Sequence, residues 1–163
     1  MAFRKILVQG DPVLQKMSRP VEKFDERLHI LIDDMRETLA AANGVGLAAP
    51  QVGILRRVVL VLDENEQMLE LVNPVIIDQK GEQDGLEGCL SVPGMYGEVK
   101  RPAFVTVRAQ DRNGKVFEVS GEDIVARCFC HEIEHLDGHL FVEKAEGGRL
   151  YTLEELEAME AED

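Results

Sequence analysis

Apolar side chains recur at the spacing of an α-helix in two long segments of the chain. The first segment runs from Asp25 to Ala42 and is followed by Asn43-Gly44, a pair that commonly ends helices. Its apolar positions are Leu28, Leu31 or Ile32, Met35 and Leu39. This pattern predicts a helix with one buried face.

The second helical segment lies between Gly121 and Gly138. Its start is acidic, as the first turn of a helix often is, and Gly138 is a suitable stop. One apolar stripe consists of Val125, Phe129, Ile133 and Leu136. A second stripe, offset from the first, consists of Ile124, Cys128, His131 and His135. Two stripes predict a helix that is buried on most of its surface.

Runs rich in β-branched residues predict strands between these helices. They cover residues 57–62, 70–77, 104–109 and, after the turn at Asn113-Gly114, 116–119. A last helix is expected at 152–160. The pattern predicts an α+β fold in which residues 1–163 form a single domain. Antiparallel or mixed β-sheets would pack around the central helix, with the C-terminal helix added to them.

Composition agrees with a single domain and indicates the compartment in which the protein works. At 163 residues and 45% apolar content, the chain can bury a core of its own. Three cysteines, two of them close together in the central helix, argue against a disulfide framework and favour a reducing cytoplasm. We find no run of 18 apolar residues and no secretory signal in residues 1–5, so we expect a cytoplasmic chain without a membrane segment.

The central helix contains the pattern H-E-x-x-H, from His131 to His135. Residues four apart lie one turn apart on a helix, so both imidazoles can bind the same metal ion. Glu132 lies on the same side, where its carboxylate can take a proton from a water bound to the metal. The sheets are therefore expected to pack around a metal-binding helix.

A catalytic site of this type needs a third protein ligand and one open position. One zinc-protease pattern would place a histidine at position 141, but Phe141 stands there. Another takes a glutamate from a later helix, for which Glu154 or Glu155 is suitably spaced. The third option is Cys89, whose thiolate would be a strong ligand and whose neighbour Gly88 allows the backbone to approach closely.

Three blocks of the chain, taken in this order and with these gaps, resemble the peptide deformylases. The blocks are Gly44-Val45-Gly46-Leu47-Ala48-Ala49-Pro50-Gln51, Glu87-Gly88-Cys89-Leu90-Ser91 and His131-Glu132-Ile133-Glu134-His135. The resemblance extends from Asp11-Pro12-Val13-Leu14 to Leu140-Phe141. The metallopeptidase that takes a downstream glutamate ligand from Glu154 or Glu155 becomes the runner-up.

The resemblance implies a role for each matching residue. Cys89, His131 and His135 would be the metal ligands, with water in the fourth position as the nucleophile. Glu132 would be the general acid and base. Gln51, through its side-chain amide, and Leu90, through its backbone N–H, would stabilise the oxyanion.

The resemblance also implies the reaction and the cofactor. The substrate would be the N-terminal formylmethionine of nascent peptides in a bacterial-type cytoplasm, and the products would be formate and a free amino terminus. One divalent metal ion is expected, and the family implies iron(II). Zinc, nickel and cobalt also suit two imidazoles and a thiolate.

A methionine side chain needs an apolar slot beside the metal. We expect Val45, Ile124 and Cys128 along this slot, the last two because they share the stripe of the histidines. The backbone around Gly46, together with Gly44, would pair with an extended peptide and so bind many peptides alike.

The charge of the chain departs from what the resemblance leads us to expect. The net charge is −13, and residues 152–163 contain six acidic residues and no basic one. Some deformylases resemble ribosome binders with a basic C-terminal helix, whereas RNA phosphate would repel an acidic one. We therefore expect that this tail does not dock on the ribosome and that the chain has no DNA partner. It would be a solvated helix held to the domain by Leu153, Leu156 and Met159.

Overall fold

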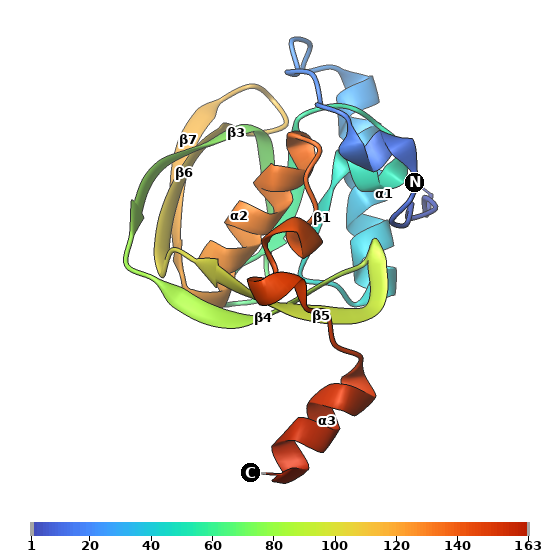
Figure 1. Cartoon of the computed structure of the whole chain (residues 1–163). Coiled ribbons are helices and arrows are strands. Elements are labelled where there is room, and N and C mark those ends of the chain that lie inside the picture. Colours follow the sequence, from blue (N-terminus) through green and yellow to red (C-terminus); the bar gives the residue numbers. More distant parts are fainter. Residues whose placement is uncertain (1, 163) are drawn as a thin grey trace.

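Two antiparallel β-sheets and three α-helices make up residues 2–162, the part of the chain that this computed structural model describes (Figure 1). The helices are α1 (Glu26–Ala42), α2 (Asp123–Leu136) and α3 (Leu153–Glu162). The strands are β1 (Gly46–Ala48), β2 (Val58–Leu62), β3 (Met68–Lys80), β4 (Gln83–Cys89), β5 (Val92–Arg101), β6 (Phe104–Gln110) and β7 (Val116–Glu122). Short 3₁₀-helices cover Pro12–Gln15, Ala49–Val52, Phe141–Lys144 and Glu146–Gly148.

The larger sheet has five strands in the order β1-β2-β3-β6-β7, and every pair of neighbours is antiparallel. The smaller sheet is the hairpin β4-β5, in which Cys89 pairs with Val92 across a two-residue turn. All strand pairs are therefore antiparallel, and the predicted α+β class is confirmed.

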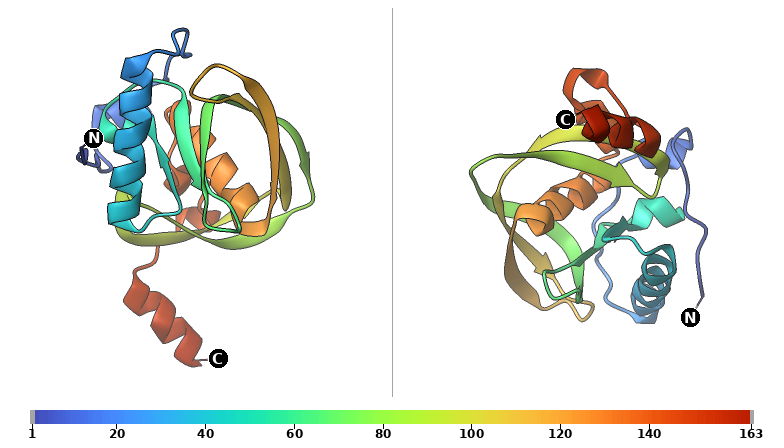
Figure 2. Two further views of the ribbon diagram at one scale, coloured as in Figure 1. Left: turned by 180° about the vertical axis from the view of Figure 1, so that it is seen from behind. Right: turned by 90° about the horizontal axis from the view of Figure 1, so that it is seen from below.

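Helices α1 and α2 lie on opposite faces of the larger sheet near β1 and β2 (Figure 2). Neighbouring side chains of a strand point to opposite faces, and β2 follows this rule. Val58 and Leu60 pack in the cluster that contains α1, whereas Val59 and Val61 pack in the cluster that contains α2. A strand with both faces covered can be apolar throughout, which explains the uninterrupted run Val58-Val59-Leu60-Val61-Leu62.

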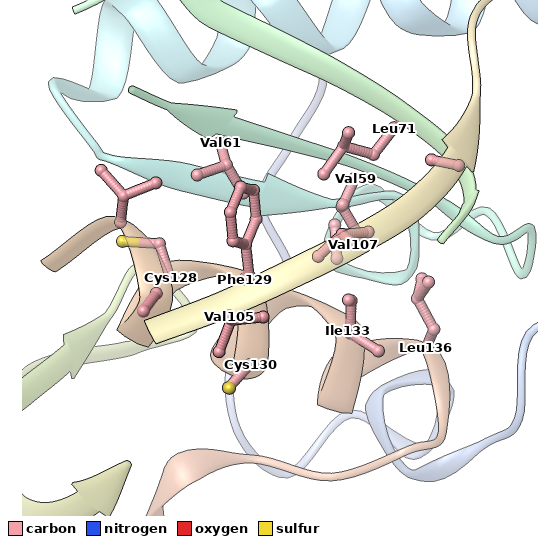
Figure 3. Packing of buried hydrophobic residues seen from close by; sticks show 14 residues of the cluster. Val59, Val61, Leu71, Val105, Val107, Cys128, Phe129, Cys130, Ile133 and Leu136 are labelled. Carbon is pink, nitrogen blue, oxygen red and sulfur yellow. The ribbon is translucent and has the colours of Figure 1, made fainter. Parts of the chain in front are cut away.

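The α2 cluster forms the centre of the domain (Figure 3). Phe129 of α2 is fully buried among the side chains of the larger sheet. The same helix contributes Cys128, Cys130, Ile133 and Leu136, and the strands contribute Val59, Val61, Leu71, Val105 and Val107. This packing fixes the position of α2, and with it the side chains on its remaining surface.

The helices and strands that the hydrophobic pattern predicts are present. The helix expected at 25–42 is α1, capped by Asp25, whose side chain accepts a hydrogen bond from Leu28 N. The central helix is α2, and the strands expected at 57–62, 70–77, 104–109 and 116–119 are β2, β3, β6 and β7, some of them longer than expected. The hairpin β4-β5 was not predicted, because its first strand is rich in glycine and acidic residues, which are uncommon in strands.

Helix α3 projects away from the rest of the molecule (Figures 1 and 2). Just before it, Tyr151 exchanges two backbone hydrogen bonds with Tyr96 of β5. Leu153 is 57% exposed and Met159 is 48% exposed, so the expectation that they hold α3 to the domain is wrong. Leu156 is half-buried. None of the helices within residues 2–162 is long and apolar enough to span a membrane.

A non-glycine residue with positive φ occurs in the turn between β2 and β3. Glu66 has a φ of 61°, a backbone conformation that an L-residue adopts at a cost and glycine adopts freely. We expect Glu66→Gly to raise the free energy of unfolding by about 0.5 to 1 kcal/mol in urea denaturation. Glu64→Gly removes the same charge at a position whose φ is not positive, and it should lower the free energy of unfolding. Stabilisation by both variants would contradict the backbone argument.

Candidate metal centre

Two elements bring the three predicted ligands together. Cys89 is the last residue of β4, and His131 and His135 lie one turn apart on α2. One ligand atom from each residue lies within 4.8 Å of the other two. The Cys89 Sγ and His135 Nε2 atoms are 3.4 Å apart. One thiol and two imidazoles converging in this way form a donor set that fits a single divalent transition-metal ion.

The carboxylate of Glu87 fixes the orientation of His131. It lies 2.9 Å from the His131 Nδ1 atom, and because a carboxylate only accepts, this nitrogen must donate. In the neutral ring the other nitrogen, Nε2, then carries no proton and faces the ligand group. The structure thus selects the tautomer that a metal ion needs.

Glu87 is itself held by two buried arginines. Arg101 donates from Nε at 2.7 Å and from Nη2 at 2.9 Å, and Arg127 donates from Nη1 at 2.7 Å. Burial alone would raise the pKa of Glu87, but the hydrogen bonds from Arg101 and His131 lower it to about 2. Glu87 therefore stays charged, and it connects β4, β5 and α2.

Glu132 faces the ligand group from α2. Its two carboxylate oxygens lie 3.9 Å from the Nε2 atoms of His131 and His135. The Oε1 atom is buried and has no hydrogen-bond partner among the described residues. Burial raises the pKa of Glu132 to about 7, although the neighbouring His131 lowers it. A buried carboxylate with an open oxygen and a pKa near neutrality is suited to holding a water and exchanging protons with it.

Gln51 and Leu90 border the ligand group on the side of Cys89. Gln51 is buried; its Oε1 accepts from Ala48 N at 2.9 Å, which orients the amide. Its Nε2 donates to Ser91 Oγ at 3.0 Å and reaches Cys89 Sγ at 3.5 Å. Leu90 lies in the turn of the β4-β5 hairpin, and its N–H takes part in none of the hydrogen bonds found within residues 2–162.

A cleft of about 380 Å³ opens over the ligand group. It is lined by Asn43, Gly44, Val45, Gly46, Gly88, Cys89, Leu90, Pro93, Gly94, Tyr96, His131 and Glu132. Gly46 shows how closely the walls approach, because a Cβ atom there would lie 2.5 Å from Glu132 Oε2. Only glycine leaves room for the carboxylate at this position.

Two residues that we expected along the methionine slot, Ile124 and Cys128, are not among those that line this cleft. Ile124 is 63% exposed and borders a separate hollow with Phe104. Cys128 is buried in the α2 core cluster (Figure 3). They share a helical stripe with the histidines, and their assignment to the substrate slot stays a prediction.

The other options for a third ligand are not supported by the geometry. Glu154 and Glu155 are exposed on α3, outside the converging group found in residues 2–162. Phe141, which occupies the position of a third histidine in one protease pattern, stacks on the ring of His131 with centroids 5.9 Å apart.

Sequence reasoning gave no role to Glu87, Arg101 or Arg127. A usable signal was present, since Glu87 stands two residues before Cys89 and side chains two apart in a strand point the same way. That signal depends on recognising β4 as a strand. The two arginines gave no local signal, because their partner is distant in sequence.

The fold and the site define a class: an α+β hydrolase whose candidate metal-binding group consists of one thiol and two imidazoles. Residues 3–149 match the family model described as polypeptide deformylase. The chain belongs to the peptide deformylase family and is an enzyme of that family.

Relatives and solved structures agree with this assignment. A peptide deformylase of Agathobacter rectalis is 55% identical over 147 residues, covering 90% of this chain and 92% of the relative. One from Caldanaerobacter subterraneus subsp. tengcongensis is 54% identical and covers 98% of each chain. The crystal structure of a peptide deformylase from Legionella pneumophila superposes with a TM-score of 0.85 at 43% identity over 99% of each chain.

Replacing the buried carboxylate should be costly for stability. Glu87→Gln would leave Arg127 and part of Arg101 with buried, unmatched charge, so we expect the free energy of unfolding to fall by about 3 kcal/mol or more. The matched control is Glu118→Gln, which breaks the exposed pair with Arg108 and should cost less than about 1 kcal/mol. Equal losses in urea denaturation would contradict the central position given to Glu87.

The three thiols should differ in reactivity. Burial raises the pKa of Cys128 to about 12 and also raises that of Cys130, so both should resist an aromatic disulfide reagent in the folded protein. Cys89 borders the cleft and should be the one that reacts first in metal-free protein. We expect one fast thiol in the native state and all three in denaturant. A fast phase that persists in Cys89→Ser would show that this ranking is wrong.

Proposed function

We propose that this enzyme removes the formyl group from the N-terminal formylmethionine of nascent peptides and releases formate. Membership of the deformylase family supports the reaction class. The observation that carries the assignment is the buried Glu132, whose unpartnered oxygen faces the converging Cys89, His131 and His135. Hydrolysis of a formamide needs a proton acceptor at this point.

We propose Cys89, His131 and His135 as the ligands of one divalent ion, iron(II) in the working enzyme. Zinc, nickel and cobalt suit the same donors. When bound, such an ion lowers the pKa of a coordinated water and polarises the carbonyl that is attacked. Glu87 would keep the His131 Nε2 atom in place for the ion through the hydrogen bond at Nδ1.

Glu132 would transfer the proton. Its pKa of about 7 allows it to accept a proton from the attacking water near neutral pH. The same carboxyl group can then donate that proton to the nitrogen of the peptide as the C–N bond breaks. Water supplies one oxygen of formate and the formyl group supplies the other, while the peptide leaves with a free amino group, so the atoms balance.

Two donors would stabilise the negative charge that develops on the formyl oxygen. The Leu90 N–H is free within the described residues, and the Gln51 amide already points its Nε2 toward Cys89 Sγ. Both groups are fixed by the fold before the substrate arrives, which is the condition for effective oxyanion stabilisation.

The edge of the larger sheet would bind the peptide. β1 has β2 on one side only, and its first residue, Gly46, lines the cleft. An extended peptide could add to this edge through backbone hydrogen bonds that do not depend on its side chains. Gly44 lines the same wall, and Val45 is half exposed there for contact with the formylmethionine side chain.

The test is formate release from a formyl-Met-Ala peptide by protein purified without oxygen and supplied with iron(II) or nickel. Glu132→Ala should lose activity by a factor of about 10² to 10⁴ or more, because it removes the proton carrier. Metal content should stay at one ion per chain. The control Glu122→Ala removes an exposed carboxylate at the start of α2 and should keep full activity.

Two results would contradict the proposal. If the parent protein binds metal but releases no formate, the reaction is wrong, and peptide-bond cleavage becomes the next assay. If Glu132→Ala binds metal and remains fully active, the reaction stands but the role of Glu132 is wrong.

A further inference from the structure

Helix α1 begins at the end of the domain opposite α3 (Figure 1). A basic hollow lies at this end. It encloses about 580 Å³ and is formed by the segment leading into α1, the first turn of α1 and the segment just before β2. The lining residues are Arg19, Pro20, Glu22, Lys23, Asp25, Arg27 and Arg56. Four of these seven side chains are cationic, in a chain whose net charge is −13.

The arginines of this basic hollow have no ionic partners in the described part of the chain. Seven other arginines form ion pairs with aspartate or glutamate, namely Arg4, Arg36, Arg57, Arg101, Arg108, Arg112 and Arg127. Arg19, Arg27 and Arg56 form none within residues 2–162, although acidic residues outnumber basic ones by 31 to 18. Arg149 also forms no ion pair there, so what distinguishes Arg19, Arg27 and Arg56 is that they gather at one place.

Two of these arginines are placed side by side by the backbone. Arg19 and Arg56 are partners in a β-bridge; Arg19 N donates to Leu55 O and Arg57 N donates to Arg19 O, both at 3.0 Å. Like charges on directly paired residues repel each other and destabilise the fold. An anion between them would convert this repulsion into attraction.

Arg27 is placed unfavourably as well. It lies in the first turn of α1, where the helix dipole presents its positive end and a cation is disfavoured. Glu22 and Asp25 also line the basic hollow, but Asp25 is engaged as the cap of α1 through Leu28 N. Four cations against two carboxylates leave a locally positive surface, and α3 with its acidic residues lies at the far end of the molecule (Figure 1).

We propose that the basic hollow binds the phosphate backbone of an RNA strand. Its lining offers cations and no aromatic ring, which suits contact with phosphates and not with bases. The choice of RNA rests on the proposed function, since a nascent peptide is made in RNA-rich surroundings. A thin strand contacts only the basic hollow, while the remaining negative surface beyond about 8 Å is screened by salt.

The test measures binding of a fluorescein-labelled oligouridylate to the metal-loaded protein by fluorescence anisotropy over a range of salt concentrations. Four phosphate contacts to a single strand predict a slope of log affinity against log salt of about −3. The double variant Arg19→Gln/Arg56→Gln should reduce the steepness of the slope to about −1.4. It should also weaken the affinity in low salt at least about tenfold. Lys100→Gln/Lys115→Gln removes the same charge elsewhere and should bind like the parent.

Formate release should be unchanged in both double variants, which serves as the check on folding and keeps this inference separate from the proposed function. Failure to bind the oligonucleotide in low salt would overturn the inference even if formate is released. Equal weakening in the lysine control would overturn it too, because binding would then reflect net charge alone. Binding to phosphatidylglycerol vesicles without binding to RNA would reassign the basic hollow to a membrane surface.

Discussion

The buried carboxylate of Glu87 accepts hydrogen bonds from Arg101, Arg127 and His131, and the arrangement of the candidate metal centre depends on this set of contacts. It ties the hairpin that supplies Cys89 to the helix that supplies both histidines. A buried charge is costly unless it is paired, so the four donor atoms, two of them from Arg101, must come together for the domain to fold. The same contacts decide which nitrogen of His131 faces the site. Folding and preparation of the ligand group are thus one event.

The larger sheet gives this centre a rigid base. The face of α2 that carries Phe129 is buried against the sheet. His131, Glu132 and His135 therefore point toward the hairpin. The close approach of Gly46 to Glu132 joins the edge strand β1 to the same point. The edge that we propose for the substrate, the proposed proton carrier and the proposed ligands therefore belong to elements that are packed against one another, which limits the reorganisation that a reaction there would require.

Much of this arrangement could be predicted from the sequence, because it depends on local periodicity. The spacing of His131 and His135 fixes their common face, and apolar runs mark β2, β3 and β6. Other parts depend on contacts between residues far apart in the chain. The residues of the hairpin β4-β5 have weak local strand preference. The pairing of its two strands, and the Arg101–Glu87 ion pair that joins them, become visible only in three dimensions. A helical stripe does not show where a cleft ends: Ile124 shares the stripe of the histidines, yet it is 63% exposed and does not line the cleft.

Helix α3 differs from the other elements in how it is attached. It has few contacts with β5, and Leu153 and Met159 are exposed, so little buried apolar contact is lost when α3 separates from the domain or unfolds. Such a segment can unfold by itself while the sheet and α2 stay intact. Its amide hydrogens would exchange with solvent at nearly the rate of a free peptide, whereas those of α2 would wait for global unfolding. The terminal helix is therefore a separate cooperative unit, free to change without disturbing the metal centre.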